Sequence, residues 1–182
     1  TDTEDTTGRV TAQSGVRVTR EEILNRIPEF TGEILQTPPM YSAVHKDGKR
    51  LYELARQGVE VEREKRPVTI TRLELLAFDE ERQEGRLAVA CSKGTYIRTL
   101  CADLALSCGS LGVMSALRRT RAAGFGLDDA VPLEQARELP REELARRVLP
   151  VDVLFQARPR VSVSAAQAAR FANGGGLSLQ RT

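Results

Sequence analysis

The strongest constraint on the fold is a change to strand-like composition after Pro67. The segments VTITRLELLAF and GRLAVAC are rich in β-branched and aliphatic residues, and the charged stretch DEERQEG joins them. The apolar residues that come next recur at helical spacing until Gly109, and they are Ile97, Leu100, Cys101, Leu104, Ala105 and Cys108. The sequence therefore predicts two successive strands followed by a helix that carries an apolar stripe.

The residues before this stretch predict a capped helix and a rigid loop. Thr19 and Glu22 have the spacing of a capping box and predict a helix start, and Pro28 interrupts or ends that helix. The opening TDTEDTTGRV is acidic and turn-rich, which predicts a loop leading into a short strand. In QTPPMYSAV, two successive prolines hold the backbone extended, so this segment should form a rigid loop.

The next segment, HKDGKRLYELARQG, predicts a turn and a short helix. Asp47–Gly48 is a turn signal with basic residues on both sides, and apolar residues then recur as far as Gly58, a typical helix C-cap. Helices are also expected between residues 132 and 148. After Pro150, the stretch RPRVSVSAAQAARFANGGG predicts a strand and a helix, which indicates the beginning of a separate small module.

Length and composition indicate an ordinary globular protein. The chain of 182 residues is long enough for one domain, or for one domain and a fragment of another, and 41% of its residues are hydrophobic. It has no apolar run of the roughly 20 residues that span a bilayer. Its three cysteines and single histidine lack metal-ligand spacing, so we expect reduced thiols, a cytoplasmic protein and no bound metal.

The distribution of charge is more informative than the net charge of +2. Residues 93–121 carry five basic side chains and one acidic side chain, that of Asp103. A local cationic zone in a nearly neutral protein favours an anionic ligand, with nucleic acid as one candidate. Solvated charged faces explain the same pattern equally well.

The motif CSKGTYIRTL places cations at the expected start of the helix, near Thr95 or Tyr96. The first amides of a helix are unpaired and its dipole is positive there, so Lys93 and Arg98 favour a carboxylate or phosphate. Arg98 follows the apolar Ile97, so it can form a partly buried pair with a carboxylate. Spacing alone favours the simpler alternative, in which Arg98 forms a structural salt bridge and Lys93 is solvated. Packing roles are equally open for Tyr41, Tyr52 and Tyr96, and the pattern alone favours a core position over a substrate contact for Leu117.

The chain resembles the bacterial tRNA pseudouridine synthase B family in three sequence blocks and in their order and spacing. The blocks are QTPPMYSAVHKDGKRLYELARQG, CSKGTYIRTL and LRRT. The opening TDTEDTTGRV is similar to a loop of that family as well. The resemblance implies an α+β pseudouridine-synthase fold, in which helices flank a mixed, largely antiparallel sheet. It also implies that residues 1–150 are the C-terminal part of the catalytic domain, with an inserted RNA-gripping lobe at 38–66. Residues 151–182 would then be the truncated start of a PUA-like module.

By this resemblance, the protein isomerises the T-loop uridine at position 55 of tRNA to pseudouridine, without metal or diffusible cofactor. Arg98 matches the arginine that pairs with the nucleophilic aspartate, Tyr96 lies beside the pocket, and Leu117 packs against the target base. The resemblance further implies RNA contacts from Lys93, Tyr41, Lys46, Lys49, Arg50, Arg56, Arg118 and Arg119. The expected partner is the T-arm of tRNA, and we expect a monomer.

The sequence departs from the family pattern in one respect. It contains neither a GTLDP-like motif, which carries the nucleophile, nor a KxYR-like block with the catalytic tyrosine. Asp2 and Asp5 belong to the acidic loop, and Asp103 projects from a different helical face than Arg98, so none of them should replace the nucleophile. We therefore expect this chain by itself to be inactive.

Three alternatives remain open. A non-catalytic tRNA-binding or chaperone module would use the lobe and the PUA-like tail. Membership of the archaeal and eukaryotic relatives that act within guide-RNA particles is a second alternative. It is disfavoured, because HKDGKRLYELARQG matches the bacterial form of this segment. An α/β domain of unrelated purpose is the third alternative, because short motifs recur by accident.

Overall fold

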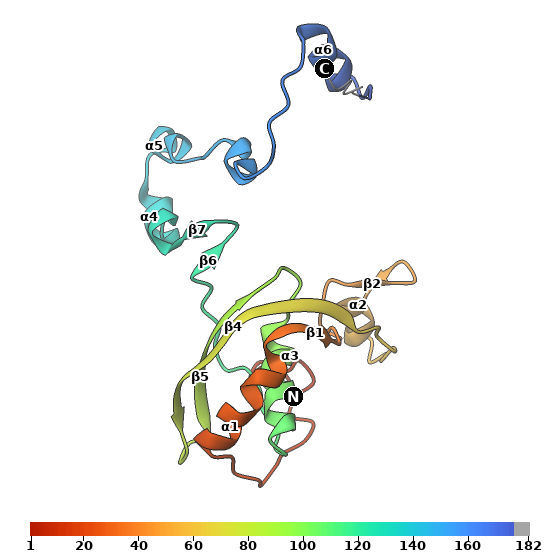
Figure 1. Ribbon diagram of the computed structural model, residues 1–182, viewed down its shortest axis with the longest axis vertical. Helices are drawn as coiled ribbons and strands as arrows, with labels where there is room; N and C mark the ends of the chain where they lie inside the picture. Colours follow the sequence, from red (N-terminus) through yellow and green to blue (C-terminus); the bar gives the residue numbers. More distant parts are fainter. Residues whose placement is uncertain (177–182) are drawn as a thin grey trace. The chain divides into compact units, whose positions relative to one another are not determined.

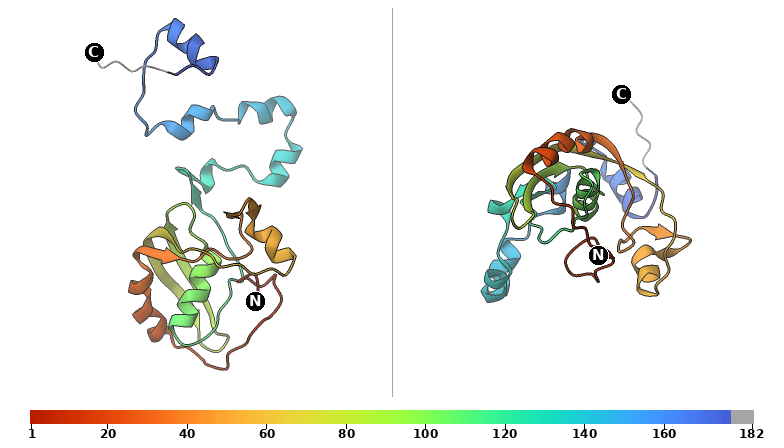
Figure 2. Two further views of the ribbon diagram at one scale, coloured as in Figure 1. Left: turned by 90° about the vertical axis from the view of Figure 1, so that its right-hand side faces the viewer. Right: turned by 90° about the horizontal axis from the view of Figure 1, so that it is seen from below.

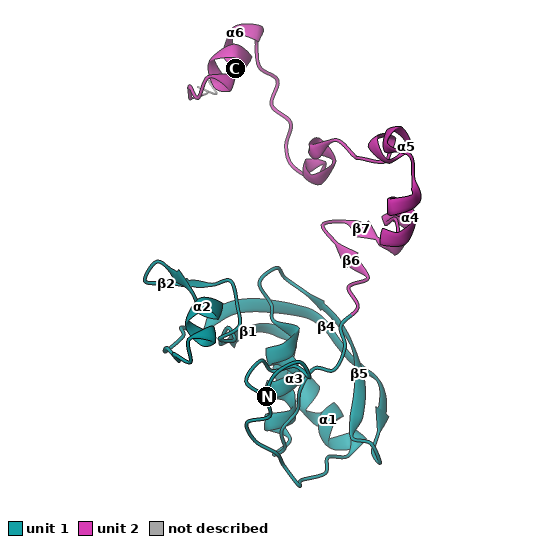
Figure 3. Ribbon diagram, turned by 180° about the vertical axis from the view of Figure 1, so that it is seen from behind, with its two compact units in different colours: residues 1–117 teal, residues 118–182 magenta. Residues whose placement is uncertain are grey.

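The computed structural model describes residues 1–176, which belong to two compact units (Figure 3), Thr1–Leu117 and a second that begins at Arg118. The first unit is built on a three-stranded antiparallel sheet in the order β1-β4-β5. Its strands are β1 (Gly32–Gln36), β4 (Arg66–Asp79) and β5 (Glu84–Cys91). The two strands predicted from composition are confirmed as β4 and β5, whereas β1 was not foreseen.

The buried face of β4 changes its sequence phase along the strand. Val68 and Ile70 are buried, and so are Leu73 and Leu75, although the two pairs differ in parity. The register of β4 with β5 shifts between Ile70 and Arg72, as at a β-bulge. An extra residue at that point returns the later pair to the same face, so the strand keeps one apolar side.

Two helical segments cover the apolar side of the sheet. The first comprises α1 (Arg20–Arg26) and the 3₁₀ turn η1 (Ile27–Phe30), and the second is α3 (Ile97–Ser107). The capping box of Thr19 and Glu22 forms as predicted, and Pro28 lies in the 3₁₀ turn that closes the helix. The helix α3 lies within the curve of the sheet, with α1 beside it (Figures 1 and 2). The predicted α+β arrangement of an antiparallel sheet and flanking helices is confirmed.

The core of the first unit forms where α3 meets β4. Leu100 and Ile70 are fully buried and contact each other in a cluster with Leu73. Partly buried apolar side chains from the helical segments and the neighbouring strands pack around it, namely Ile27, Phe30, Ile34, Leu87, Val89 and Ile97. The N-terminus of α3 is therefore attached to a packed core, which restricts where its first residues can lie.

A small lobe follows β1. The predicted proline loop has no regular structure, and the predicted turn at Asp47–Gly48 joins β2 (His45–Lys46) to β3 (Lys49–Arg50). Both turn residues have positive φ, 52° and 79°, which suits the type I′ geometry of a two-residue hairpin. The helix α2 (Leu51–Arg56) comes next, and Gly58 follows its end with φ +73°. The local signals of this segment are confirmed.

The opening segment does not lead into a strand, so that prediction is wrong. Residues 9–19 form no regular element, and the loop instead makes an isolated parallel bridge between Asp5 and Met114. The Thr6 amide donates to the Met114 carbonyl at 3.1 Å, and the Met114 amide donates to Glu4 at 3.1 Å. Short polar side chains in this loop bond to nearby backbone, which competes with strand pairing.

The second unit contains short elements, in chain order β6 (Arg121–Ala122), β7 (Phe125–Gly126), η2 (Leu127–Asp129), α4 (Leu133–Glu138), α5 (Arg141–Arg146), η3 (Val151–Phe155) and α6 (Ala165–Ala172). The helices predicted between residues 132 and 148 and the helix of the tail are confirmed. The strand predicted over RPRVSV is wrong, because residues 159–164 form no strand. The two strands described in this unit pair with each other and offer that segment no partner. Part of the predicted tail module, residues 177–182, lies outside the described residues.

Candidate functional site

The start of α3 positions the most informative side chain of the chain. Tyr96 is the N-cap residue, with extended φ −97° and ψ 107°, so the predicted helix start is confirmed and Arg98 is the second helical residue. The backbone of Tyr96 is held by the Gln36 side chain, which accepts from the Tyr96 amide at 2.8 Å and donates to its carbonyl at 3.0 Å. Arg98 therefore leaves a helix end whose position is set by a neighbouring strand.

Arg98 joins three segments that are distant in sequence. Its Nη1 donates to the Thr3 carbonyl at 3.1 Å and to Asp5 Oδ2 at 3.2 Å, and its Nη2 donates to the Tyr41 carbonyl at 2.9 Å. The side chains of Arg98 and Asp5 are only 22% and 16% exposed. This is the partly buried ion pair that the motif predicted, and it is also the structural salt bridge of the simpler alternative.

The carboxylate of Asp5 is surrounded by hydroxyl and amide donors. Its Oδ1 accepts from the Thr3 hydroxyl at 2.8 Å, from the Thr7 amide at 3.0 Å and from the Thr7 hydroxyl at 2.5 Å. The Thr7 hydroxyl is the largest cause, and Arg98 a smaller one, of a lowered pKa of Asp5, about 2. Asp5 is therefore a firmly ionised anchor for Arg98. The sequence alone did not identify it as that partner, because the two residues are 93 positions apart.

A second carboxyl group lies next to this pair in a different environment. Glu4 accepts a hydrogen bond from the Thr99 hydroxyl and has a positive φ of 62°. Burial is the largest influence on its pKa and raises it, Asp103 raises it further, and Thr99 and Arg98 act in the opposite direction. Burial also raises the pKa of Asp103. Neighbouring residues of one loop thus present a carboxylate and a carboxyl group that holds its proton more tightly.

Four of the cationic side chains predicted to contact RNA, Lys46, Lys49, Arg50 and Arg56, lie on the lobe. Arg50 and Arg56 lie over the Tyr52 ring, with guanidinium carbons 5.9 and 5.2 Å from its centroid. Lys49 is exposed on the hairpin, while Lys46 donates its ammonium to the Glu62 carbonyl. Lys46 therefore ties the hairpin to the segment that leaves the lobe, a role that the sequence did not indicate.

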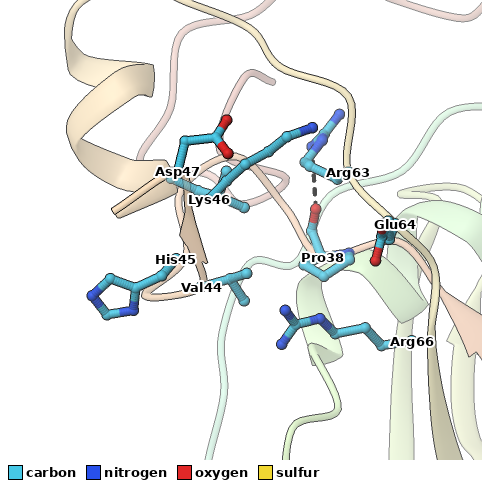
Figure 4. Close-up of a pocket in the computed structure, with 9 residues that line it drawn as sticks. Pro38, Val44, His45, Lys46, Asp47, Arg63, Glu64 and Arg66 are labelled. Carbon is cyan, nitrogen blue, oxygen red and sulfur yellow. Dashed lines mark hydrogen bonds between the residues drawn. The ribbon is translucent and has the colours of Figure 1, made fainter. Parts of the chain in front are cut away.

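A shallow cavity of about 300 Å³ lies at the base of the lobe (Figure 4). Its lining combines three cationic residues, Lys46, Arg63 and Arg66, with two acidic ones, Asp47 and Glu64, and with apolar residues that include Pro38 and Leu51. Arg63 donates to the Pro38 carbonyl at 3.2 Å, and its buried Nε has no partner among residues 1–176. The unfilled donor suits a ligand that carries an acceptor oxygen.

The remaining predicted site residues are less constrained. Tyr96 is half-buried and Lys93 is exposed, both beside Arg98 in the chain, and Tyr41 supplies its carbonyl to Arg98. Leu117, with 55% of its surface exposed, ends the first unit, and its contact with a target base stays a prediction. The same holds for the RNA contacts of the exposed residues Arg118 and Arg119.

The part of the chain that the structure describes has neither a metal-binding cluster of side chains nor a membrane-spanning helix. No group of three or more His, Cys, Asp or Glu side chains within residues 1–176 could hold a metal ion. No helix in that part of the chain is sufficiently long and apolar to cross a membrane.

Comparisons with protein families give matches over most of the chain. Residues 1–97 match the model described as "TruB family pseudouridylate synthase (N terminal domain)", and residues 98–156 match "tRNA pseudouridylate synthase B C-terminal domain". A relative from Aromatoleum aromaticum named tRNA pseudouridine synthase B is 47% identical over 96% of this chain and 56% of its own length. One of the same name from Dechloromonas aromatica is 43% identical over 98% of this chain and 59% of its own length. The chain spans little more than half the length of these curated relatives.

A solved structure resembles the chain in fold. It is titled "Crystal Structure of a Cbf5-Nop10-Gar1 Complex", and the superposition has a TM-score of 0.66 with 24% sequence identity. It covers 90% of this chain and 46% of the other. At this identity the likeness supports the fold alone.

Replacement of Asp5 by Asn should change how the stability of the first unit depends on pH. Because the pKa of Asp5 is lowered in the folded state, its ionised form stabilises the fold fully above the ordinary value of 3.8, and this contribution is lost as the pH falls toward about 2. The wild-type free energy of unfolding should therefore fall more steeply across this interval than that of Asp5→Asn. Urea unfolding at a series of pH values measures the difference, and parallel curves would contradict the assignment.

A matched pair of threonine variants isolates the cause. Thr7→Ala removes the hydroxyl that contributes most to the lowered pKa of Asp5, so a carboxyl NMR titration should move toward the ordinary value of 3.8. The Thr6 hydroxyl has no hydrogen bond among residues 1–176, so Thr6→Ala should leave that titration unchanged.

Proposed function

Because the chain belongs to the TruB family of pseudouridylate synthases, we propose that the polypeptide carrying it isomerises the T-loop uridine, position 55 of tRNA, to pseudouridine. The observation that carries this proposal is the partly buried Arg98, held at the start of α3 beside Asp5. The family models and the relatives named tRNA pseudouridine synthase B support a reaction on tRNA. The T-arm as the bound element, a monomeric state and a cytoplasmic location are parts of the same proposal.

The reaction calls for a cation next to a carboxylate in a sheltered site. The uracil must leave the base stack, detach from C1′, rotate and rejoin through C5. A carboxylate nucleophile needs to stay ionised, and an adjacent guanidinium favours its charged form. Arg98 uses three of its five N–H donors within residues 1–176, so Nε and one Nη2 hydrogen are available for another carboxylate. This chemistry requires no metal or diffusible cofactor.

Asp5 is not the nucleophile in this proposal. Its Oδ1 accepts three hydrogen bonds and its Oδ2 pairs with Arg98, so donors on both oxygens stabilise its charge. A carboxylate stabilised to a pKa of about 2 is a weak nucleophile. We assign Asp5 the role of orienting Arg98, while Tyr96 and Leu117 shelter the target base. The nucleophile then belongs to a GTLDP-like motif, which this sequence does not contain.

The lobe supplies the proposed grip on RNA. Lys49, Arg50 and Arg56 are exposed, and two of these cations flank the Tyr52 ring. Such a surface attracts phosphates and offers a stacking face for a base. Further contacts are proposed for the other cationic and aromatic candidates, Tyr41, Lys46, Lys93, Arg118 and Arg119. Residues 151–182 are proposed as the start of a PUA-like RNA-binding module.

A second function is favoured by the state of Asp5. The carboxylate that contacts Arg98 is stabilised by four hydrogen bonds, whereas the lobe cations Lys49, Arg50 and Arg56 remain exposed. The chain by itself could thus bind or chaperone tRNA without catalysis. The two functions differ in turnover and agree in RNA binding, so both quantities need measurement.

The 182-residue chain alone should not isomerise uridine. Tritium release from tRNA labelled at C5 of uridine should stay at the level of the uncatalysed control, since the carboxylate on Arg98 is not free to attack. The full-length polypeptide that carries this sequence is the positive control. Turnover by the pure chain would contradict the role given to Asp5.

In the full-length polypeptide, Arg98→Ala should lower kcat by at least about 100-fold, the usual effect of removing a group that stabilises charge at the reacting centre. Affinity for tRNA should change by less than about tenfold, because Arg98 serves the nucleophile more than binding. Arg72→Ala is the matched control, since Arg72 is an exposed residue paired with Glu74 on the sheet. An unchanged kcat for Arg98→Ala would refute the proposed role.

Binding of a T-arm stem-loop by the 182-residue chain should depend strongly on salt. Replacing Arg56 or Lys49 with Ala should lower affinity and reduce the slope of log affinity against log salt by about one, if each neutralises one phosphate. Arg72→Ala again serves as the control and should leave the slope unchanged. Absence of binding at low salt would contradict an RNA-binding lobe.

A further inference from the structure

The side chain of Gln36 joins the last residue of β1 to the first turn of α3. It is 2% exposed, and its amide bonds to both the N–H and the C=O of Tyr96, at 2.8 and 3.0 Å. The two residues are 60 positions apart. A primary amide that satisfies a donor and an acceptor of one backbone residue fixes both the position and the orientation of that residue.

The start of α3 depends on this clamp more than an ordinary helix start does. No side chain caps the helix at Tyr96. Its first turn also contains no acidic side chain that would complement the helix dipole. The Tyr96 carbonyl also accepts the first intrahelical hydrogen bond, from the Leu100 amide at 3.0 Å. Gln36 therefore holds the residue from which the helix begins, and Arg98 lies two positions further on.

The proline loop contacts the same helix end a second time. Its beginning, Gln36, holds Tyr96, and its far end, Tyr41, accepts from Arg98 Nη2 through its carbonyl at 2.9 Å. Pro38 and Pro39 between them are buried, and proline fixes φ at each position. The loop is thus a short, stiff connection that is attached to both Tyr96 and Arg98.

We propose that Gln36 is a positioning residue for Arg98: its amide sets the first turn of α3 so that the guanidinium is directed at Asp5 and the Tyr41 carbonyl. The consequence for turnover rests on the proposed function, whereas the consequence for the Arg98 side chain does not. The matched control is Gln83, which also clamps one backbone residue and whose amide donates in addition to the Glu80 carbonyl at 2.8 Å. Gln83 accepts from the Val18 amide at 2.7 Å and donates to the Val18 carbonyl at 2.9 Å.

The test uses Gln36→Glu and Gln83→Glu in the full-length polypeptide. An ionised carboxylate still accepts from the backbone amide but repels the carbonyl, while its protonated form can donate again. Burial raises the pKa of the introduced carboxyl above the ordinary value of about 4.3, so the donor returns on acidification. Gln36→Glu should lose about 100-fold in kcat at pH 8, with little change in KM, and should recover as the pH approaches 5.5. Gln83→Glu should lose stability to a similar extent but keep the kcat and pH profile of the wild type.

An NMR measurement on the 182-residue chain tests the geometry without any turnover. Gln36→Glu should shift the Arg98 guanidinium signals, and Gln83→Glu should not. Gln36→Met, which removes both hydrogen bonds without burying a charge, covers the case in which the first variant does not fold, and it should shift those signals at every pH. Unshifted Arg98 signals in both Gln36 variants would overturn the inference. Shifted signals with unchanged turnover would uphold the positioning role and refute the role proposed for Arg98 in turnover.

A double mutant separates positioning from general destabilisation. If Gln36 acts through Arg98, adding Gln36→Glu to Arg98→Lys should change kcat by less than about threefold, because coupled residues are not additive. Multiplication of the two single-mutant losses would show that Gln36 acts independently of Arg98 and would contradict the proposal.

Discussion

The hydrogen bonds of Arg98 are the interaction on which the site depends. A partly buried guanidinium is tolerated only when its donors meet acceptors, and here they meet two backbone carbonyls and one carboxylate. Two of these acceptors, the Thr3 carbonyl and the Asp5 carboxylate, belong to the opening loop, and the third, the Tyr41 carbonyl, belongs to the proline loop. The opening loop, which has no regular element of its own, is thereby attached to the unit at Arg98 and at the bridge to Met114. Removing the cation would leave the Asp5 carboxylate without its partner and would loosen both loops.

Two adjacent carboxyl groups near Arg98, those of Glu4 and Asp5, lie in different environments. Asp5 receives hydroxyl and amide donors and stays ionised, whereas the adjacent Glu4 is partly buried, bonds to Thr99 of α3 and holds its proton more tightly. Carboxyl groups with pKa values shifted from their ordinary range are frequent at functional sites. The lobe, in contrast, keeps its cations exposed around Tyr52, as a surface that attracts phosphate does. In the proposed function, positioning and binding belong to different parts of one unit, which the proline loop connects.

The features that were predicted correctly depend on contacts between near neighbours in the chain. The capping box of Thr19 and the turn at Asp47–Gly48 each involve residues within a few positions. The strands expected after the opening loop and in the tail were wrong, because a strand exists only with a partner and composition does not supply one. The strand β1 was missed for the same reason, since its pairing with β4 joins Ile34 to Val68 across the whole lobe.

The sequence by itself determined the α+β class, most local elements, the family resemblance and the choice of Arg98 as the central side chain. Only the tertiary structure decided that Asp5 is the carboxylate on Arg98, that Gln36 holds Tyr96 and that Lys46 ties the lobe to Glu62. These contacts span 93, 60 and 16 positions. The physical reason is that spacing along a chain specifies only the hydrogen bonds within a turn or two. The partner of a distant polar group depends on which segments the packed core, with Leu100 and Ile70 at its centre, brings together.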